Sequence, residues 1–172
     1  MKVWHALALA LLLATAASGQ QPQIKIGYVD LQRALNDSAA GKKAKEQFKV
    51  QVDRLQVDLK KQKDEIDALK GQLEKKALVV KEEERRNLEK DYQRRLRDFE
   101  RSYKDSQSEL QMKDSELTNE LLKEIQVVIE EYGKQGGYTV ILEQSSSSVL
   151  YGAPEVDLTD KIIEAYNNKK KK

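Results

Sequence analysis

Residues 48–73, FKVQVDRLQVDLKKQKDEIDALKGQL, repeat apolar side chains in alternating steps of four and three residues. The repeating positions are Phe48, Val52, Leu55, Leu59, Ile66, Leu69 and Leu73, with Gln62 in the one gap. This spacing places them on one stripe of an α-helix and is the heptad seam of a coiled coil. The stretch therefore predicts a long helix that pairs with a second helix along its length.

A second apolar series, looser than the first, follows in the same region. Its positions are Leu88, Tyr92, Leu96, Phe99, Tyr103, Leu110, Leu117, Leu121, Ile125 and Val128, with polar Ser106 and Lys113 at two seam places. Between residues 40 and 132 there is no proline, and the only glycines are Gly41 and Gly71, which is typical of unbroken helix. We expect an antiparallel hairpin that turns within residues 75–86. The alternative is one continuous rod that pairs with another chain.

Short β-strand patterns flank the helical region on both sides. IKIGYVD at 24–30 precedes it, while YTVILE at 138–143 and VLYG at 149–152 follow it. We expect the last two segments to pair as short antiparallel strands. Because a lone strand leaves its edges unsatisfied, we expect the hairpin to bring all three segments together in one small β body. This flanking also favours the hairpin over the rod.

The C-terminal stretch DLTDKIIEAYN, residues 157–167, predicts one more amphipathic helix. Asp157 or Thr159 can cap its start. Its apolar face consists of Leu158, Ile162, Ile163 and Tyr166. Residues 169–172 are all lysine and are expected to form a solvated basic tail.

These patterns predict a mainly α fold with a small β body. Residues 42–134 form the long antiparallel helical hairpin, here called the tentacle, and it is inserted into a body made of residues 20–41 and 135–168. A body of fewer than 60 residues rarely buries enough apolar surface to be stable alone, so we expect it to oligomerise. The apolar residues expected at that interface are Ile24, Ile26, Tyr28, Val29, Val140, Leu142, Val149 and Tyr151.

Residues 1–19 have the pattern of a cleaved secretory signal peptide. Lys2 precedes an apolar run over residues 6–14, and small residues precede the expected cleavage after Gly19, with cleavage after Ala16 as the alternative. An uncleaved membrane anchor is the rival interpretation, but the run is shorter than the roughly 20 residues that span a bilayer. We therefore expect export.

The residue types left after cleavage argue against an enzyme. The only tryptophan and the only histidine, Trp4 and His5, lie in the expected signal peptide, and the chain has no cysteine. Histidine-dependent triads, cysteine nucleophiles and the usual zinc ligand sets are therefore excluded. The two Gly-Lys pairs, at 41–42 and 133–134, lack the preceding glycine of a nucleotide phosphate loop. We expect no catalytic residue, metal or cofactor.

Charge is divided unevenly along the chain. Residues 42–104 carry 20 basic and 14 acidic side chains, net +6, whereas residues 105–172 carry 8 and 13, net −5. Candidate contact residues for a partner on the cationic arms are Lys75, Lys76, Arg85, Arg86, Arg94 and Arg95. Such a surface can attract acidic polypeptides, phosphorylated lipid head groups or a membrane. The alternative is an ordinary solvated coiled-coil surface.

Four valines are further contact candidates. Val50 and Val57 lie opposite the first seam, where a solvated hairpin would carry polar residues. Val79 and Val80 add apolar surface near the predicted tip. These side chains can hold an unfolded polypeptide weakly. The alternative for Val50 and Val57 is packing against the body or a neighbouring subunit.

Several terminal motifs resemble the Skp (OmpH) family of periplasmic chaperones. They are KIGYVDLQRAL at 25–35, AGKKA at 40–44, GYTVILE at 137–143, VLYG at 149–152 and DLTDKIIEAYN at 157–167. The resemblance covers the whole mature chain. The charged helices between these motifs would match many coiled coils.

The resemblance implies a homotrimer in the periplasm, with a β body and three tentacles around a central cavity. It also implies that the chain holds unfolded outer-membrane proteins there without ATP, until they reach the outer-membrane assembly machinery. Lipopolysaccharide is a further partner that the family implies. The alternatives are a structural coiled-coil envelope protein and a protein that binds acidic polymers or nucleic acid through the basic arms.

Overall fold

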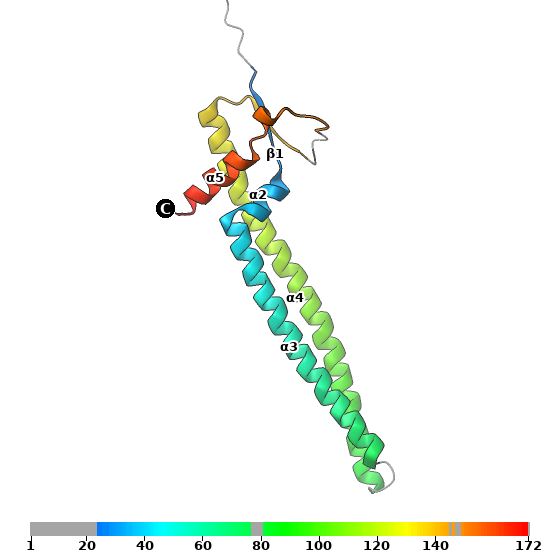
Figure 1. The fold of residues 1–172 in the computed structure, drawn as a ribbon. Helices are drawn as coiled ribbons and strands as arrows, with labels where there is room; N and C mark the ends of the chain where they lie inside the picture. Colours follow the sequence, from blue (N-terminus) through cyan, green and yellow to red (C-terminus); the bar gives the residue numbers. More distant parts are fainter. Residues whose placement is uncertain (1–23, 77–80, 145, 147–148, 172) are drawn as a thin grey trace, which may run out of the picture.

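The structure of the chain, a computed structural model, describes residues 24–76, 81–144, 146 and 149–171. A long helical hairpin projects from a small head that contains the other elements (Figure 1). In chain order the elements are β1 (Ile26–Val29), α2 (Leu31–Asp37), α3 (Ala39–Lys76), α4 (Glu82–Gly136), β2 (Val140–Glu143), the 3₁₀ helix η1 (Pro154–Val156) and α5 (Thr159–Lys169). The predicted fold class, mainly α with a small β component, is confirmed.

The two arms of the hairpin are α3 and α4, which run antiparallel side by side (Figure 1). With 38 and 55 residues, they are about 57 Å and 80 Å long. Polar contacts join the arms: Gln51 Nε2 donates to Glu109 Oε1 at 2.7 Å, and Arg95 Nη1 donates to Glu65 Oε2 at 2.7 Å. The hairpin prediction is therefore confirmed, and the continuous-rod alternative is wrong.

α4 ends at a glycine in the left-handed conformation. Gly137 has φ 65° and donates its backbone N–H to the carbonyl of Lys134, while Tyr138 donates to the carbonyl of Gly133 at 3.0 Å. Glycine adopts this conformation without strain, which is why it commonly closes helices. The Lys25 amine donates to the Gly136 carbonyl at 2.8 Å and thereby ties the helix end to the N-terminal segment.

The strand prediction was only partly right. Residues 140–143 form a strand, but it pairs in parallel with β1, with Ile26 opposite Val140 and Val29 opposite Glu143. The segment 149–152 is not a strand. The expected antiparallel pair is therefore absent from the part of the chain that the structure describes.

The edge of β1 that faces away from β2 is occupied by the segment before α5. Asp157 forms a β-bridge with Tyr28, and the Leu158 N–H donates to the Tyr28 carbonyl at 2.9 Å. Gly152 instead lies against the Tyr28 ring, so closely that a Cβ there would be 2.3 Å from a ring carbon. That edge of β1 is thus occupied, and the segment 149–152 does not pair with the outer edge of β2 either.

The hydrophobic core lies where α4 passes through the head. Its buried residues come from β1, α2, α4 and the C-terminal segment, and they are Val29, Ala34, Leu121, Ile125, Val128, Leu158, Ile162 and Tyr166. The predicted apolar face of the last helix is confirmed, with Ile163 packed at the edge of this core. Neither predicted cap is the N-cap residue, which is Leu158 without a side-chain cap hydrogen bond, although the Asp157 Oδ1 accepts from the Thr159 N–H at 2.9 Å.

Two of the C-terminal lysines form ion pairs with α4. α5 continues to Lys169, whose amine contacts both Glu131 carboxylate oxygens at 2.7 and 2.8 Å. Lys170 reaches Glu124 at 2.7 Å, and the Tyr166 hydroxyl donates to the same carboxylate. Burial opposes ionisation of Glu124, but the hydrogen bonds from Lys170 and Tyr166 lower its pKa overall. Lys169 and Lys170 are thus exposed, as expected of a solvated tail, and each also pairs with a carboxylate of α4.

The connection between α2 and α3, the first arm, brings the two backbones into close contact. Ser38 between them is buried, and its hydroxyl donates to the Leu35 carbonyl and accepts from the Gly41 N–H. A Cβ on Gly41 would lie 1.7 Å from the Leu35 carbonyl oxygen. Only glycine therefore allows the backbones to approach so closely, and this contact sets the direction in which α3 leaves the head.

We predict that Gly41→Ala destabilises the protein by about 2 kcal/mol, because the added methyl group must push α2 and α3 apart. Gly71→Ala is the matched control in the same helix, since a methyl group added there would have nothing within 4 Å. At that position alanine should stabilise the protein by up to about 1 kcal/mol. Urea unfolding followed by circular dichroism measures both. Equal stabilities of the two variants would contradict the junction argument.

Candidate functional site

The exposed valines of α3 are the first part of the candidate site. Val50 and Val57 lie on the side opposite the seam and are 68% and 66% exposed. Neither packs against the head of its own protomer, so that alternative explanation fails within one chain. Val79 and Val80 lie outside the described residues, as does the side chain of Lys76.

The antiparallel register brings two further apolar residues to the same heights of the hairpin. Gln51 contacts Glu109, and Glu65 contacts Arg95. A residue of α3 and the residue of α4 level with it along the hairpin therefore have numbers that add up to about 160. Val57 is therefore level with Tyr103, and Val50 lies near the height of Met112. Tyr103 is 46% exposed and Met112 67% exposed. We call Val50, Val57, Tyr103 and Met112 the apolar band.

Sequence reasoning missed the last two members of the band. Tyr103 fits the second seam, so the pattern indicates a packing residue. Met112 follows the seam residue Leu110 by two positions and thus lies off the stripe. Met112 could have been identified from sequence as an apolar residue that lies off the seam. The same signal identified Val50 and Val57 on α3.

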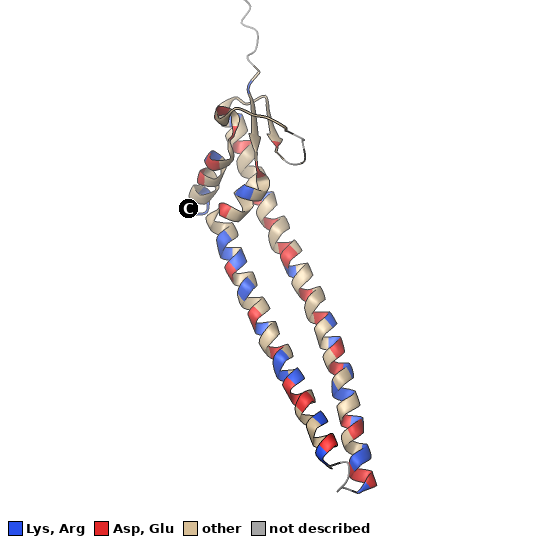
Figure 2. Ribbon diagram, turned by 45° about the vertical axis from the view of Figure 1, so that its right-hand side comes forward, with Lys and Arg blue, Asp and Glu red and all other residues tan. Residues whose placement is uncertain are grey.

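The distal half of the hairpin has a different surface. In residues 60–76 and 82–100, as far as the structure describes them, no large apolar side chain is mainly exposed. Charged side chains of both signs alternate there along both arms (Figure 2). Apolar exposure on the arms is thus concentrated in the half nearest the head, apart from what residues 77–80 contribute.

The predicted cationic residues have different partners. Arg85 contacts Glu82 at 2.9 Å, and this hydrogen bond lowers the pKa of the carboxyl. Arg94 pairs with Asp91 on its own helix. Arg95 pairs with Asp91 at 3.3 Å and with Glu65 of the other arm at 2.7 Å, so it holds the arms together.

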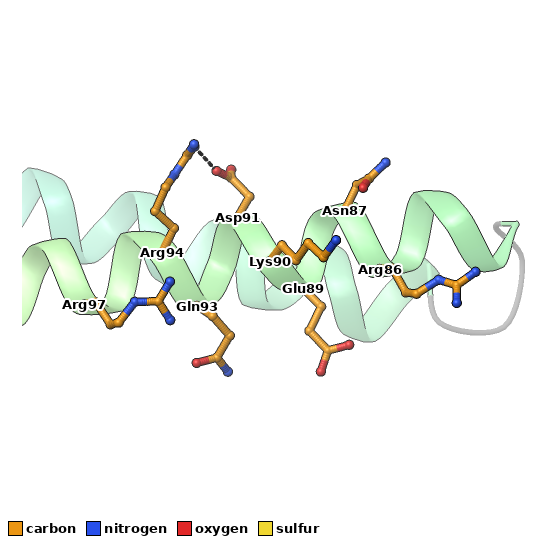
Figure 3. Close-up of a pocket in the computed structure, with 8 residues that line it drawn as sticks. All are labelled: Arg86, Asn87, Glu89, Lys90, Asp91, Gln93, Arg94 and Arg97. Atoms are coloured by element: carbon orange, nitrogen blue, oxygen red, sulfur yellow. Dashed lines mark hydrogen bonds and ion pairs between the residues drawn. The ribbon is translucent and has the colours of Figure 1, made fainter.

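Lys75 and Arg86 are exposed and form no ion pair among the described residues. Arg86 belongs to a basic surface on α4 whose shallow hollow is lined by Arg86, Asn87, Glu89, Lys90, Asp91, Gln93, Arg94 and Arg97 (Figure 3). Every lining residue comes from one helix, and the side chains project to different sides of it. A surface of this kind can attract anions but cannot exclude water as an enclosed active site does.

The head carries a second apolar surface. Ile26 is opposite Val140, and Tyr28 is opposite Leu142, so all four share one face of the sheet. Of these four, Tyr28 is half-buried, and Ile26, Val140 and Leu142 are exposed. Val149, from the loop that follows β2, is also half-buried. Leu150 and Tyr151 are 98% and 87% exposed. Val29 differs from the other predicted interface residues because it is buried in the core of its own protomer.

Two kinds of site are missing from the described part of the chain. It has no group of three or more acidic or histidine side chains placed to hold a metal ion. It also has no helix that is long and apolar enough to cross a membrane. The candidate site therefore consists of open surfaces: the apolar band, the distal charges and the apolar face of the head.

The family model described as outer membrane protein (OmpH-like) matches residues 25–166. The chain belongs to the OmpH-like family. The resemblance found in the terminal motifs is therefore confirmed.

Two relatives of this OmpH-like chain support the assignment over nearly its full length. The Skp-like protein of Pseudomonas aeruginosa is 26% identical over 156 residues, which cover 88% of this chain and 89% of the relative. The crystal structure of an OmpH-like outer membrane chaperone from Caulobacter crescentus has the same fold. It aligns with a TM-score of 0.79 and 16% sequence identity over 85% of each chain.

We predict that Arg95→Ala weakens the hairpin more than Arg94→Ala does. Loss of the contact with Glu65 should cost about 0.5 to 1 kcal/mol, whereas the pair within α4 contributes only about 0.3 kcal/mol. Urea unfolding at low salt and at about 1 M salt measures both, because salt screens exposed pairs. The tie between the arms would be refuted if the two variants lost equal stability at low salt.

Proposed function

We propose that the protein is an ATP-independent periplasmic holdase, which binds unfolded outer-membrane proteins between its helical arms and prevents their aggregation. The observation that carries this proposal is the apolar band. Val50 and Val57 are about two-thirds exposed on a helix whose seam packs elsewhere, so packing within the protomer does not explain them. Membership of the OmpH-like family and the fold shared with the OmpH-like outer membrane chaperone of Caulobacter crescentus support the same function.

Many weak contacts suit a chaperone that has no energy source. Burial of one exposed valine contributes roughly 1 to 2 kcal/mol, and part of this is offset by the ordering of the bound chain. A few such contacts hold an unfolded segment but still release it. Folding of the client into the membrane then supplies the free energy for its transfer.

We further propose that the heads assemble into a homotrimer, with three tentacles around a cavity. The sheet face with Ile26 and Val140, together with Leu150 and Tyr151, exposes several large apolar side chains on one small head, and such groups often mark interaction surfaces. The outer edge of β2 also has no strand partner among the described residues, and open edges invite pairing with another chain. The distal cations then form the surface that acidic clients, lipopolysaccharide or an anionic membrane would meet.

We predict that the double variant Val50→Ser, Val57→Ser suppresses aggregation less well than the unchanged protein. Both side chains are exposed, so folding should be unaffected, while the affinity for a client should fall about tenfold through lost apolar contact. Light scattering of a urea-denatured outer-membrane β-barrel protein after dilution measures the suppression.

The double variant Gln47→Ser, Gln56→Ser is the matched control, because both glutamines are exposed on the same helix. It should protect the client as well as the unchanged protein does. If the unchanged protein fails to delay aggregation even in excess, the holdase proposal is wrong and a structural role in the envelope replaces it.

We predict that Ile26→Asp dissociates the oligomer and leaves the helical content nearly intact. A carboxylate on the sheet face cannot be buried at a subunit interface without a partner. The mass in solution, from light scattering coupled to gel filtration, measures the change. Gln32→Asp, an exposed position on α2, is the control and should retain the mass of the unchanged protein. A monomeric mass for the unchanged chain would refute the assembly.

A further inference from the structure

A shallow groove lies on α3 close to the head. Its lining residues are Lys42, Lys45, Glu46, Phe48, Lys49 and Val52. Phe48 and Val52 are half-buried and exposed residues surround them, so the two apolar side chains form the floor. The lysines are three and four residues apart and therefore line one side of the helix.

The seam of α4 is polar opposite the floor, and the apolar residue at this height, Met112, lies off the seam. By the register of the arms, Phe48 lies near residue 112, where the nearest seam position of α4 is Lys113 in place of an apolar residue. The Lys113 amine contacts Glu116 on its own helix at 2.8 Å. Phe48 thus has no apolar seam residue directly opposite to cover it.

The rim of the groove carries excess positive charge. Three lysines face one glutamate, which gives a net charge of +2. Lys49 pairs with Asp53 at 2.7 Å, but Lys42 and Lys45 enter no ion pair among the described residues. The complementary ligand therefore combines an apolar group with a negative charge a few ångströms away.

We propose that this groove binds the C-terminal residue of an unfolded client when that residue is apolar. Its side chain lies on Phe48 and Val52, and its α-carboxylate lies between Lys42 and Lys45. The inference rests on the proposed function and names the part of the client that this site takes.

The geometry of an extended chain favours a C-terminus over an acidic residue next to the apolar one, and an acidic residue two positions away lies about 7 Å farther along the chain. Successive side chains of an extended segment point to opposite faces. An internal Asp-Phe pair therefore directs its charge away from the groove when the ring lies on the floor. At a C-terminus the carboxylate and the side chain leave the same Cα, so both can reach the groove together.

The test uses the full-length mature chain and a fluorescent ten-residue peptide that ends in Phe, prepared as the free acid and as the C-terminal amide. Fluorescence anisotropy should show about fivefold tighter binding of the free acid, because two exposed lysine contacts contribute modestly each. The double variant Lys42→Gln, Lys45→Gln should bind both peptides equally. The double variant Lys63→Gln, Lys70→Gln, exposed farther along α3, should retain the preference.

Three results would overturn the proposal: no measurable binding of the free acid, equal binding of acid and amide, or equally tight binding of an amidated peptide with an internal Asp-Phe pair. Suppression of aggregation, measured in parallel, separates this inference from the holdase function. If the unchanged protein protects the client but shows no acid preference, only the groove assignment fails. If it does not protect the client, the function itself fails.

Discussion

The burial of one face of α4 within the head is the interaction on which the rest of the structure depends. Leu121, Ile125 and Val128 pack against side chains from β1, α2 and the C-terminal segment, which come from opposite ends of the chain. The same helix continues outward as the second arm to Glu82. The packing of the head therefore sets the direction of the tentacle, because one helix runs through both.

The hairpin could be predicted from sequence because a heptad seam is a local, repeated property of the chain. The sheet could not be predicted in full, because its pairing depends on distant elements. β2 is parallel to β1 since α4 runs past the sheet before the chain turns at Gly137. The segment 149–152 has the composition of a strand, but it does not pair with β2, and Asp157 and Leu158 occupy the β1 edge on the other side of the sheet.

The candidate site shows the same division between local pattern and tertiary register. Val50 and Val57 could be identified from sequence because they are apolar residues that lie off a regular heptad seam. The second seam is looser, so Tyr103 and Met112 did not stand out. Arg94 and Arg95 look equivalent as neighbours in sequence, yet only Arg95 reaches the other arm. The register between α3 and α4 determines which of the two arginines reaches Glu65. This register cannot be read from the sequence alone.

The distribution of charged and apolar side chains along the arms suggests an order in which a client would contact them. Charges act over about 8 to 10 Å at physiological salt, whereas apolar side chains act only on contact. The distal half carries charge and the half nearest the head carries the apolar band. Under the proposed function, an incoming client would meet the charged outer arms first and the apolar band later, near the head. Retention by contact area alone also explains release, because a client that buries its own apolar surface on folding no longer offers it to the arms.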